Sequence, residues 1–305
     1  MNHSTQAYDR WILALQSQSL SAEQVLRARL SFSPQSQSLS NRLEHLDRLK
    51  AMLDLFRPLN GEIVAELKQR YDVRFTYHSN AIEGNTLSLR ETALVLERGI
   101  TIAGKSLKEH LEVIGHEQAI NYIESFAKAD AVIDEWELRQ IHSLILRQID
   151  PEMAGRFRRL DVKAAGTEYV YPPHYQVQAL MISFVQWLNS QEALSLHPIV
   201  YASEAHLRLV TIHPFQDGNG RLARLLMNLL LIRSGFPITV ITNQQRSDYI
   251  DAIVQAQADR GTEALFILVA NAAQEALIES LSVVATAASS RGQGQGFFEQ
   301  IIHYF

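Results

Sequence analysis

Hydrophobic residues recur along most of this chain at the three- and four-residue spacing that gives a helix one apolar face. The clearest case follows residue 220, where leucines occupy positions 222, 225, 226, 229 and 230. A second stripe of leucines lies at positions 43, 46, 49, 53 and 55 and ends at the helix-breaking stretch Pro58–Gly61. The same spacing predicts further helices, over residues 89–98, 106–128, 134–148, 174–190 and 198–212. The chain is therefore predicted to be all-α.

One segment departs from this helical pattern. Residues Val162–Tyr171 collect β-forming side chains around Gly166 and end at Pro172 and Pro173. Such a run, bounded by turn residues, is typical of a short β-hairpin. By the residues alone, it is an ordinary surface hairpin as readily as a functional one.

Three regions follow from these patterns. We expect an N-terminal helical region over residues 1–60, a core over residues 61–288, and a flexible linker with an apolar tail over residues 289–305. Alternating glycine and glutamine at 292–296 indicates the linker. The sequence leaves open whether the tail docks on its own core, on a second protomer or on a partner.

Composition narrows the class of protein. The chain has 305 residues, a net charge of −5 and no cysteine. The negative balance argues against nonspecific nucleic-acid binding, and the missing cysteines exclude disulfides and thiol catalysis. Polar residues interrupt the apolar stretch 265–288, so it is predicted to be a buried helix and not a membrane span. We expect a cytoplasmic protein without a membrane partner.

The densest concentration of chemical groups lies in residues 213–224, which read His-Pro-Phe-Gln-Asp-Gly-Asn-Gly-Arg-Leu-Ala-Arg. Glycines allow backbone N–H groups to approach phosphate oxygens closely, and the leucine-rich helix that follows presents its positive N-terminal end to the same anion. Two arginines, three residues apart, share one face of its first turn. This inventory suits a polyphosphate and its metal held beside a basic histidine. The alternative is a polar turn between two helices.

This stretch resembles the signature of the Fic family of nucleotidyl transferases, His-Pro-Phe-x-Asp-Gly-Asn-Gly-Arg-x-x-Arg. The resemblance implies a Fic-type helical core and transfer of AMP from ATP to a hydroxyl of a target protein. It makes His213 the catalytic base and Asp217 the ligand of Mg²⁺. The nucleotide-binding residues that it implies are Gly218, Asn219, Gly220, Arg221, Arg224 and, further along, Tyr249.

A second match to the family lies upstream. Ser79 and Glu83 fit the inhibitory pattern Ser/Thr-x-x-x-Glu-Gly/Asn, and the pattern predicts an inhibitory helix over about 71–85 that stops at Gly84-Asn85. The resemblance implies that Glu83 pairs with Arg224 and occupies the place of the γ-phosphate. The hairpin, about 162–172, matches a family flap that binds the target backbone. Its target-binding residues would be Thr167, Glu168, Tyr169 and Val170.

From about Tyr71 to Asp251 the chain is similar to animal members of the family, which modify an Hsp70 chaperone of the endoplasmic reticulum. We expect no counterpart here of their membrane anchor and tetratricopeptide repeats. Ile250 and Gln257 stand where those enzymes carry a tyrosine and an asparagine, which leaves nucleotide preference open. The stretch Gly104–Leu107 matches a dimer-forming segment and implies a homodimer. The alternative is a leucine buried within its own chain.

The resemblance therefore predicts an autoinhibited protein adenylyltransferase that uses ATP and Mg²⁺ on a Ser, Thr or Tyr hydroxyl. Two alternatives remain. The same residues would serve a phosphodiesterase that removes AMP, with Glu83 positioning water, and a non-enzymatic scaffold would keep only the fold. The sequence names no target protein and does not say whether transfer or removal dominates.

Overall fold

The computed structural model describes residues 38–129, 131–163 and 169–290. Its helices confirm the all-α prediction, and the part of the chain that is described contains no strand. The helices are α3 (Leu39–Asp54), α4 (Gly61–Ile82), α5 (Leu89–Arg98), α6 (Leu107–Lys128), α7 (Glu135–Leu146), α8 (Val177–Leu188), α9 (Gln191–Leu194), α10 (Pro198–Ile212), α11 (Asn219–Arg233), α12 (Arg246–Gln257) and α13 (Glu263–Ser290), with 3₁₀ turns η1 (His174–Gln176) and η2 (Asn243–Gln245).

Local sequence explains where several helices begin. Ser88 and Ser106 cap α5 and α6 through reciprocal capping boxes with Glu91 and Glu109. Pro198 occupies the first turn of α10, where its missing N–H costs nothing. These signals are the reason that the predicted ranges 89–98 and 198–212 are confirmed to the residue. The predicted helix 174–190 is shorter, because it begins with η1 and α8 ends at Leu188.

The described residues divide into two compact units, and the boundary falls within α4 and within α13. One unit contains α3, the first turns of α4 and the latter part of α13. Within it, Arg42 donates a 2.7 Å hydrogen bond to Asn271, and Arg70 lies 3.3 Å from the largely buried Glu279. The apolar stripe of α3 is buried through Leu46, Leu49, Met52 and Leu53. That residues 1–60 form a separate N-terminal helical region stays a prediction.

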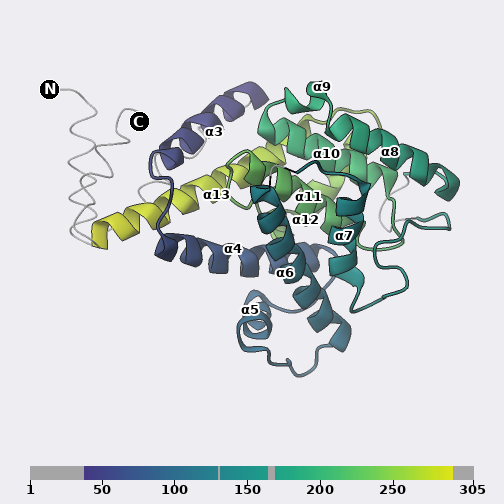
Figure 1. The fold of residues 1–305 in the computed structure, drawn as a ribbon, viewed down its shortest axis with the longest axis horizontal. Coiled ribbons are helices and arrows are strands. Elements are labelled where there is room, and N and C mark those ends of the chain that lie inside the picture. Colours follow the sequence, from purple (N-terminus) through teal and green to yellow (C-terminus); the bar gives the residue numbers. More distant parts are fainter. Residues whose placement is uncertain (1–37, 130, 164–168, 291–305) are drawn as a thin grey trace. The chain divides into compact units, whose positions relative to one another are not determined.

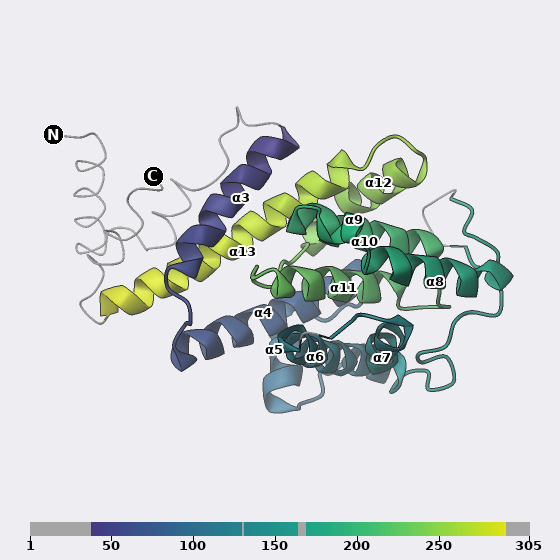
Figure 2. The same cartoon turned by 45° about the horizontal axis from the view of Figure 1, so that its top comes forward.

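The other unit spans residues 71–269 and is built around α11 (Figure 1). Helices α10, α6 and α7 pack against α11, and the second view shows them on different sides of it (Figure 2). Almost every residue of α11 is buried, from Asn219 to Leu231. A helix covered on all sides needs apolar residues around its whole circumference, which explains its run of leucines. Its polar N-terminal turn is held at a fixed place within the core.

Helix α13 is long and apolar enough to cross a membrane, by length and composition, over Glu263–Ala288. In the structure, 78% of that window is buried, as in a core helix. The absence of a membrane partner stays a prediction.

The hairpin prediction over about 162–172 is neither confirmed nor contradicted. Residues 162–163 and 169–172 have no strand assignment. Residues 164–168, with the predicted target-binding residues Thr167 and Glu168, lie outside the described residues.

Candidate active site

The loop between α10 and α11 is shaped by two residues in the left-handed conformation. His213 ends α10 with φ 52° and ψ 58°, and Gly218 precedes α11 with φ 79°. Between them, the side-chain amide of Asn219 closes the loop: its oxygen accepts from the Phe215 N–H and its nitrogen donates to the Phe215 carbonyl, both at 2.9 Å. Asn219 also lines the cavity, and its part in nucleotide binding stays a prediction.

No side chain caps the first turn of α11. Its first N–H groups are thus left for a ligand, and the helix dipole favours an anion there. Gly220 is part of this turn. A Cβ at this position would overlap Oε1 of Glu83 and would lie 3.2 Å from the guanidinium of Arg224. A Cβ there would thus displace the Glu83 carboxylate, which lies directly against the backbone of this turn.

His213 is oriented as a base. Its Nδ1 lies 3.2 Å from the carbonyl of Val210. A carbonyl only accepts, so Nδ1 carries the proton and Nε2 keeps a free lone pair. Burial lowers the pKa of His213, and this, with the positive charge of Arg158, favours the neutral form despite the nearby carboxylates of Glu83 and Asp217. A neutral imidazole with an unprotonated Nε2 is the form that accepts a proton.

His142, which no sequence motif marks as a site residue, supports the loop that precedes α11. His142 of α7 accepts from the Gly155 N–H at 2.9 Å and donates from Nε2 to the Asp217 carbonyl at 2.9 Å. Its ring stacks on Phe215 with centroids 3.6 Å apart. Burial lowers its pKa to about 4. Its partners are far away in sequence, so no local pattern announces it.

Glu83 and Arg224 form an ion pair. The guanidinium of Arg224, 2% exposed, donates from NH2 to Oε1 of Glu83 at 2.7 Å, and the glutamate side chain is 41% exposed. Ser79 holds the same guanidinium twice, accepting from Nε on its hydroxyl at 3.0 Å and from NH2 on its carbonyl at 2.8 Å. The phenol of Tyr249 lies 3.3 Å from NH1 and 2.7 Å from the buried His206. The structure thus brings together four predicted site residues, Ser79, Glu83, Arg224 and Tyr249.

The helix that bears Ser79 ends earlier than the predicted inhibitory helix, which extended to about residue 85. Helix α4 runs from Gly61 to Ile82, so Glu83 is the residue after the helix and not part of its face. The N–H of Asn85 returns to the Asn80 carbonyl and that of Gly84 to the Ala81 carbonyl, each at 3.0 Å. This is a Schellman termination, which needs the positive φ of 101° found at Gly84. Glu83 therefore reaches Arg224 from a fixed helix end.

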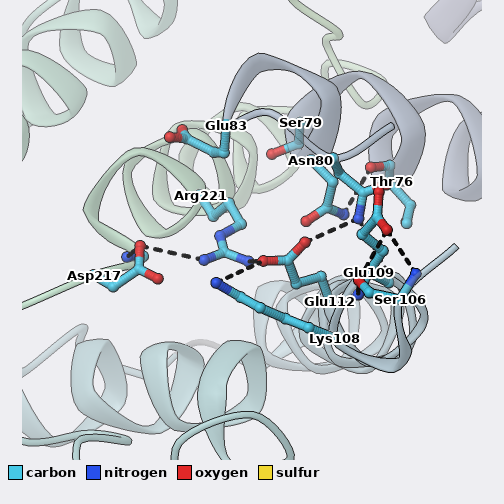
Figure 3. Close-up of polar contacts among 12 residues, drawn as sticks. Thr76, Ser79, Asn80, Glu83, Ser106, Lys108, Glu109, Glu112, Asp217 and Arg221 are labelled. Carbon is cyan, nitrogen blue, oxygen red and sulfur yellow. Dashed lines mark hydrogen bonds and ion pairs between the residues drawn. The ribbon is translucent and has the colours of Figure 1, made fainter. Parts of the chain in front are cut away.

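Arg221 lies between carboxylates on two elements (Figure 3). It is 2% exposed, with NH2 3.4 Å from Asp217 and NH1 3.6 Å from Glu112 of α6. Its Nε and NH1 have no hydrogen-bond partner among the residues described. Glu112 is also bound by Asn85, at 2.9 Å. A buried guanidinium with unused donors suits a further anion beside Asp217.

Glu83, His213, Asp217 and Arg224 line one cavity of about 390 Å³. Apolar residues of α12 line another part, together with Gln257, whose amide lies 3.4 Å from the Thr211 hydroxyl. Ile250 and Gln257, the two residues that leave nucleotide preference open, thus both line this cavity. Tyr249 also lines the cavity, but its ring is 1% exposed.

The described part of the predicted flap meets the base. The ring of Tyr171 lies 4.2 Å from that of His213, and the ring of Tyr169 lies 5.1 Å from Tyr171. Val170 is 86% exposed. Target binding by Tyr169 and Val170 stays a prediction, as it does for Thr167 and Glu168.

Comparison with solved structures decides the family. A fragment of Fic-1 from C. elegans is 30% identical and superposes with a TM-score of 0.72, over 87% of this chain and 83% of that fragment. A form of that fragment with a glutamate replaced by glycine is 31% identical, with a TM-score of 0.71 over 80% of this chain and 72% of that one. The chain belongs to the Fic family. The model of the Fic/DOC family matches residues 132–231, which include the loop 213–224.

A Fic protein of Bacteroides thetaiotaomicron, described as a Fic domain containing signaling protein, has a TM-score of 0.71 at 29% identity, over 82% of this chain and 98% of that protein. Among curated proteins, the protein adenylyltransferase Fic of Drosophila melanogaster is 41% identical over 214 residues. That match covers 70% of this chain and 43% of the relative, so the chain spans less than half of that relative's length.

Proposed function

We propose that this Fic protein is a protein adenylyltransferase that its own Glu83 holds in an inhibited state. The observation that supports this most is the ion pair of Glu83 with Arg224, 2.7 Å long, at the first turn of α11. The carboxylate lies against Gly220 and beside a buried guanidinium, which is the environment that an anion of a nucleotide would need. The activity is that of the adenylyltransferase relatives, carried over with the site residues.

The inhibition follows from competition for one guanidinium. Arg224 is fixed by Ser79 and Tyr249, so it cannot follow a ligand elsewhere. A γ-phosphate that approaches it meets the Glu83 carboxylate, and two anions at one site repel each other. ATP then binds with its phosphate chain displaced from the productive position. Removal of the carboxylate frees the guanidinium for the phosphate.

In the proposed reaction, Nε2 of His213 accepts the proton of a Ser, Thr or Tyr hydroxyl of the target protein. The hydroxyl oxygen bonds to the α-phosphorus of ATP, the bond from that phosphorus to the bridging oxygen breaks, and pyrophosphate leaves. Arg221 and the amides of α11 would hold the phosphate chain. Positioning and charge neutralisation supply most of the acceleration in such transfers.

The residues present fit a magnesium ion. Asp217 is 59% exposed at the cavity; one carboxylate oxygen accepts from the Gly218 N–H at 2.6 Å, and the other is free within the described chain. Mg²⁺ ordinarily takes one or two carboxylates and completes its shell with phosphates and water. This agrees with the lack of any group of three or more candidate ligands among the residues described. When bound, Mg²⁺ would neutralise charge on the phosphates.

One observation favours removal of AMP as a second candidate activity. Glu83 and His213 line the same cavity, so a carboxylate that orients water and an imidazole that passes the proton are both at hand. We keep a homodimer, a cytoplasmic location and the absence of membrane and nucleic-acid partners as further parts of the proposal.

The test is incubation with labelled ATP and Mg²⁺, comparing the native chain with Glu83→Gly. Label on protein only in the variant supports inhibited transfer. Release of AMP from a pre-adenylylated protein by the native chain, lost in the variant, supports the phosphodiesterase. If neither protein transfers or releases AMP, both activities are refuted and the non-enzymatic scaffold is the remaining hypothesis. Mass spectrometry of lysate proteins labelled by Glu83→Gly would then identify the target.

A further inference from the structure

A further buried arginine, Arg158, contacts the backbone of the loop that bears His213. The side chain of Arg158 is 0% exposed. Its guanidinium donates to three backbone carbonyls: from Nε to His213 at 2.8 Å, from NH1 to Leu160 at 3.1 Å, and from NH2 to Pro172. Its backbone N–H donates to the carbonyl of Pro214 at 2.9 Å. One residue thus makes four hydrogen bonds to three separate stretches of chain.

The three carbonyls belong to positions that matter for the site. Leu160 and Pro172 flank the segment 161–171 on its two sides, and His213 is the predicted base. Among the residues that the structure describes, the carboxylate near the guanidinium is that of Asp161, at 3.7 Å and 68% exposed. A buried charge without a close buried counterion is costly, so it must be compensated by well-placed hydrogen bonds. Arginine suits this because its planar fork directs several donors at fixed angles.

From this arrangement we propose that Arg158 is a positioning residue, which joins the base-bearing loop to the backbone at Leu160 and at Pro172. The proposal rests on the adenylyltransfer function given above. By holding the carbonyl of His213, Arg158 stabilises the left-handed backbone from which the imidazole projects. By holding Leu160 and Pro172, it fixes these two carbonyls relative to His213, together with the adjacent ring of Tyr171, which lies against the imidazole.

Two further observations agree with this role. The ring of Tyr171, one residue before Pro172, already contacts the ring of His213 at 4.2 Å. Arg158 itself is not among the residues that line the nucleotide cavity. It therefore acts through the geometry of other groups, and its loss should slow the transfer step without weakening the hold on ATP.

The chain offers a matched control in Arg233, at the opposite end of α11 from the catalytic loop. Its NH2 donates to the carbonyls of Phe126, Ala129 and Ala131, at 3.4, 3.4 and 2.7 Å. Arg233→Met thus also removes an arginine that donates to backbone carbonyls, here from a single nitrogen, far from the base in sequence and outside the cavity lining. It measures what the loss of such contacts does to stability alone.

The experiment uses the full chain with Glu83→Gly as the active parent, and adds Arg158→Met, Arg158→Lys or Arg233→Met. The initial rate of self-labelling is measured at saturating ATP, and the Kd for ATP is measured by calorimetry. We expect Arg158→Met to lower the rate by roughly tenfold to a hundredfold, as ångström-scale misplacement does, with the Kd for ATP unchanged. Arg158→Lys should recover part of the rate, because one ammonium can still reach some of the carbonyls. Arg233→Met should keep the rate of the parent.

A rate with Arg158→Met equal to that of the parent would overturn the proposal, and so would an equal fall of the rate with Arg233→Met. A parent that labels nothing would refute the adenylyltransfer function instead. In that case hydrogen–deuterium exchange still decides the positioning role, using native chain and Arg158→Lys, which is the variant better able to fold. Faster exchange confined to residues around 160 and 172–176 supports it, whereas unchanged exchange there, or equally faster exchange throughout α11, refutes it.

Discussion

Replacement of Glu83 tests the inhibitory ion pair directly, because the change removes one carboxylate and leaves the other partners of Arg224 in place. In Glu83→Gly, the guanidinium keeps its two contacts with Ser79, at 3.0 and 2.8 Å, and its neighbour Tyr249 at 3.3 Å. The arginine should therefore stay where it is. What changes is the occupant of the space beside Gly220, which becomes free for the γ-phosphate.

The magnitude follows from the strength of the contact that ATP must displace. A hydrogen bond to a charged partner contributes roughly 1.5–3 kcal/mol, which corresponds to a factor of about ten to a hundred. The Glu83 side chain is 41% exposed, so solvent screening places the effect toward the lower end. We expect Glu83→Gly to raise self-labelling from ATP by about tenfold or more.

Two matched variants separate the carboxylate from the backbone. Glu83→Ala removes the charge but adds no glycine flexibility at the end of α4, and should activate as strongly as Glu83→Gly. Glu83→Gln keeps the size of the side chain and a hydrogen bond to Arg224, and should activate less. Activation by glycine alone would assign the effect to loosening of the helix end. Equal labelling by the native chain and all three variants would refute inhibition by Glu83.

Three further predictions follow from the site and the surface. In the Glu83→Gly background, His213→Ala should abolish labelling while calorimetry still shows ATP binding, since the base is not a ligand of the nucleotide; retained transfer would mean that His213 has another role. Leu107 is 70% exposed, so the alternative of a leucine buried in its own chain is wrong. Light scattering should show a dimer at tens of micromolar protein, and Leu107→Asp should dissociate it. A native chain that is monomeric at that concentration would refute this prediction. Burial lowers the pKa of His142 to about 4 and that of His206 to about 3, so both stay neutral in the fold. Their contribution to stability is complete above pH 6.5 and is lost as the pH falls toward 4, by roughly 2 kcal/mol for each at pH 5; equal urea midpoints at pH 7 and pH 5 would contradict it.

Most helices of the fold can be predicted from the sequence, because the signals that start a helix lie within its own first turn. The capping serines of α5 and α6, and Pro198 in α10, act on the turn that they begin, so those helices were predicted almost to the residue. The end of α4 shows the limit. Gly84 was recognised as a stop, but the Schellman bonds end the helix at Ile82, before Glu83.

The catalytic loop could be proposed from residues 213–224, since its groups are adjacent in the chain. The residues that hold it could not be. His142 binds Gly155 and Asp217, which lie 13 and 75 residues away in sequence, and nothing in its surroundings on α7 marks these partners. The side chain of Asn219 likewise has a structural partner that the sequence does not announce, the backbone of Phe215, while its part in phosphate binding stays a prediction.

Two of the buried arginines near the site, Arg158 and Arg224, differ in what compensates their charge, and this difference separates regulation from geometry. Arg158 is held by carbonyls, which are part of the backbone and have no alternative state. Arg224 is held partly by Glu83, whose side chain is 41% exposed and is therefore free to exchange with another anion. A guanidinium with a replaceable counterion responds to a ligand, whereas one with fixed acceptors sets a distance. Substitution at Glu83 should accordingly change whether the enzyme acts, and substitution at Arg158 how fast it acts once ATP is bound.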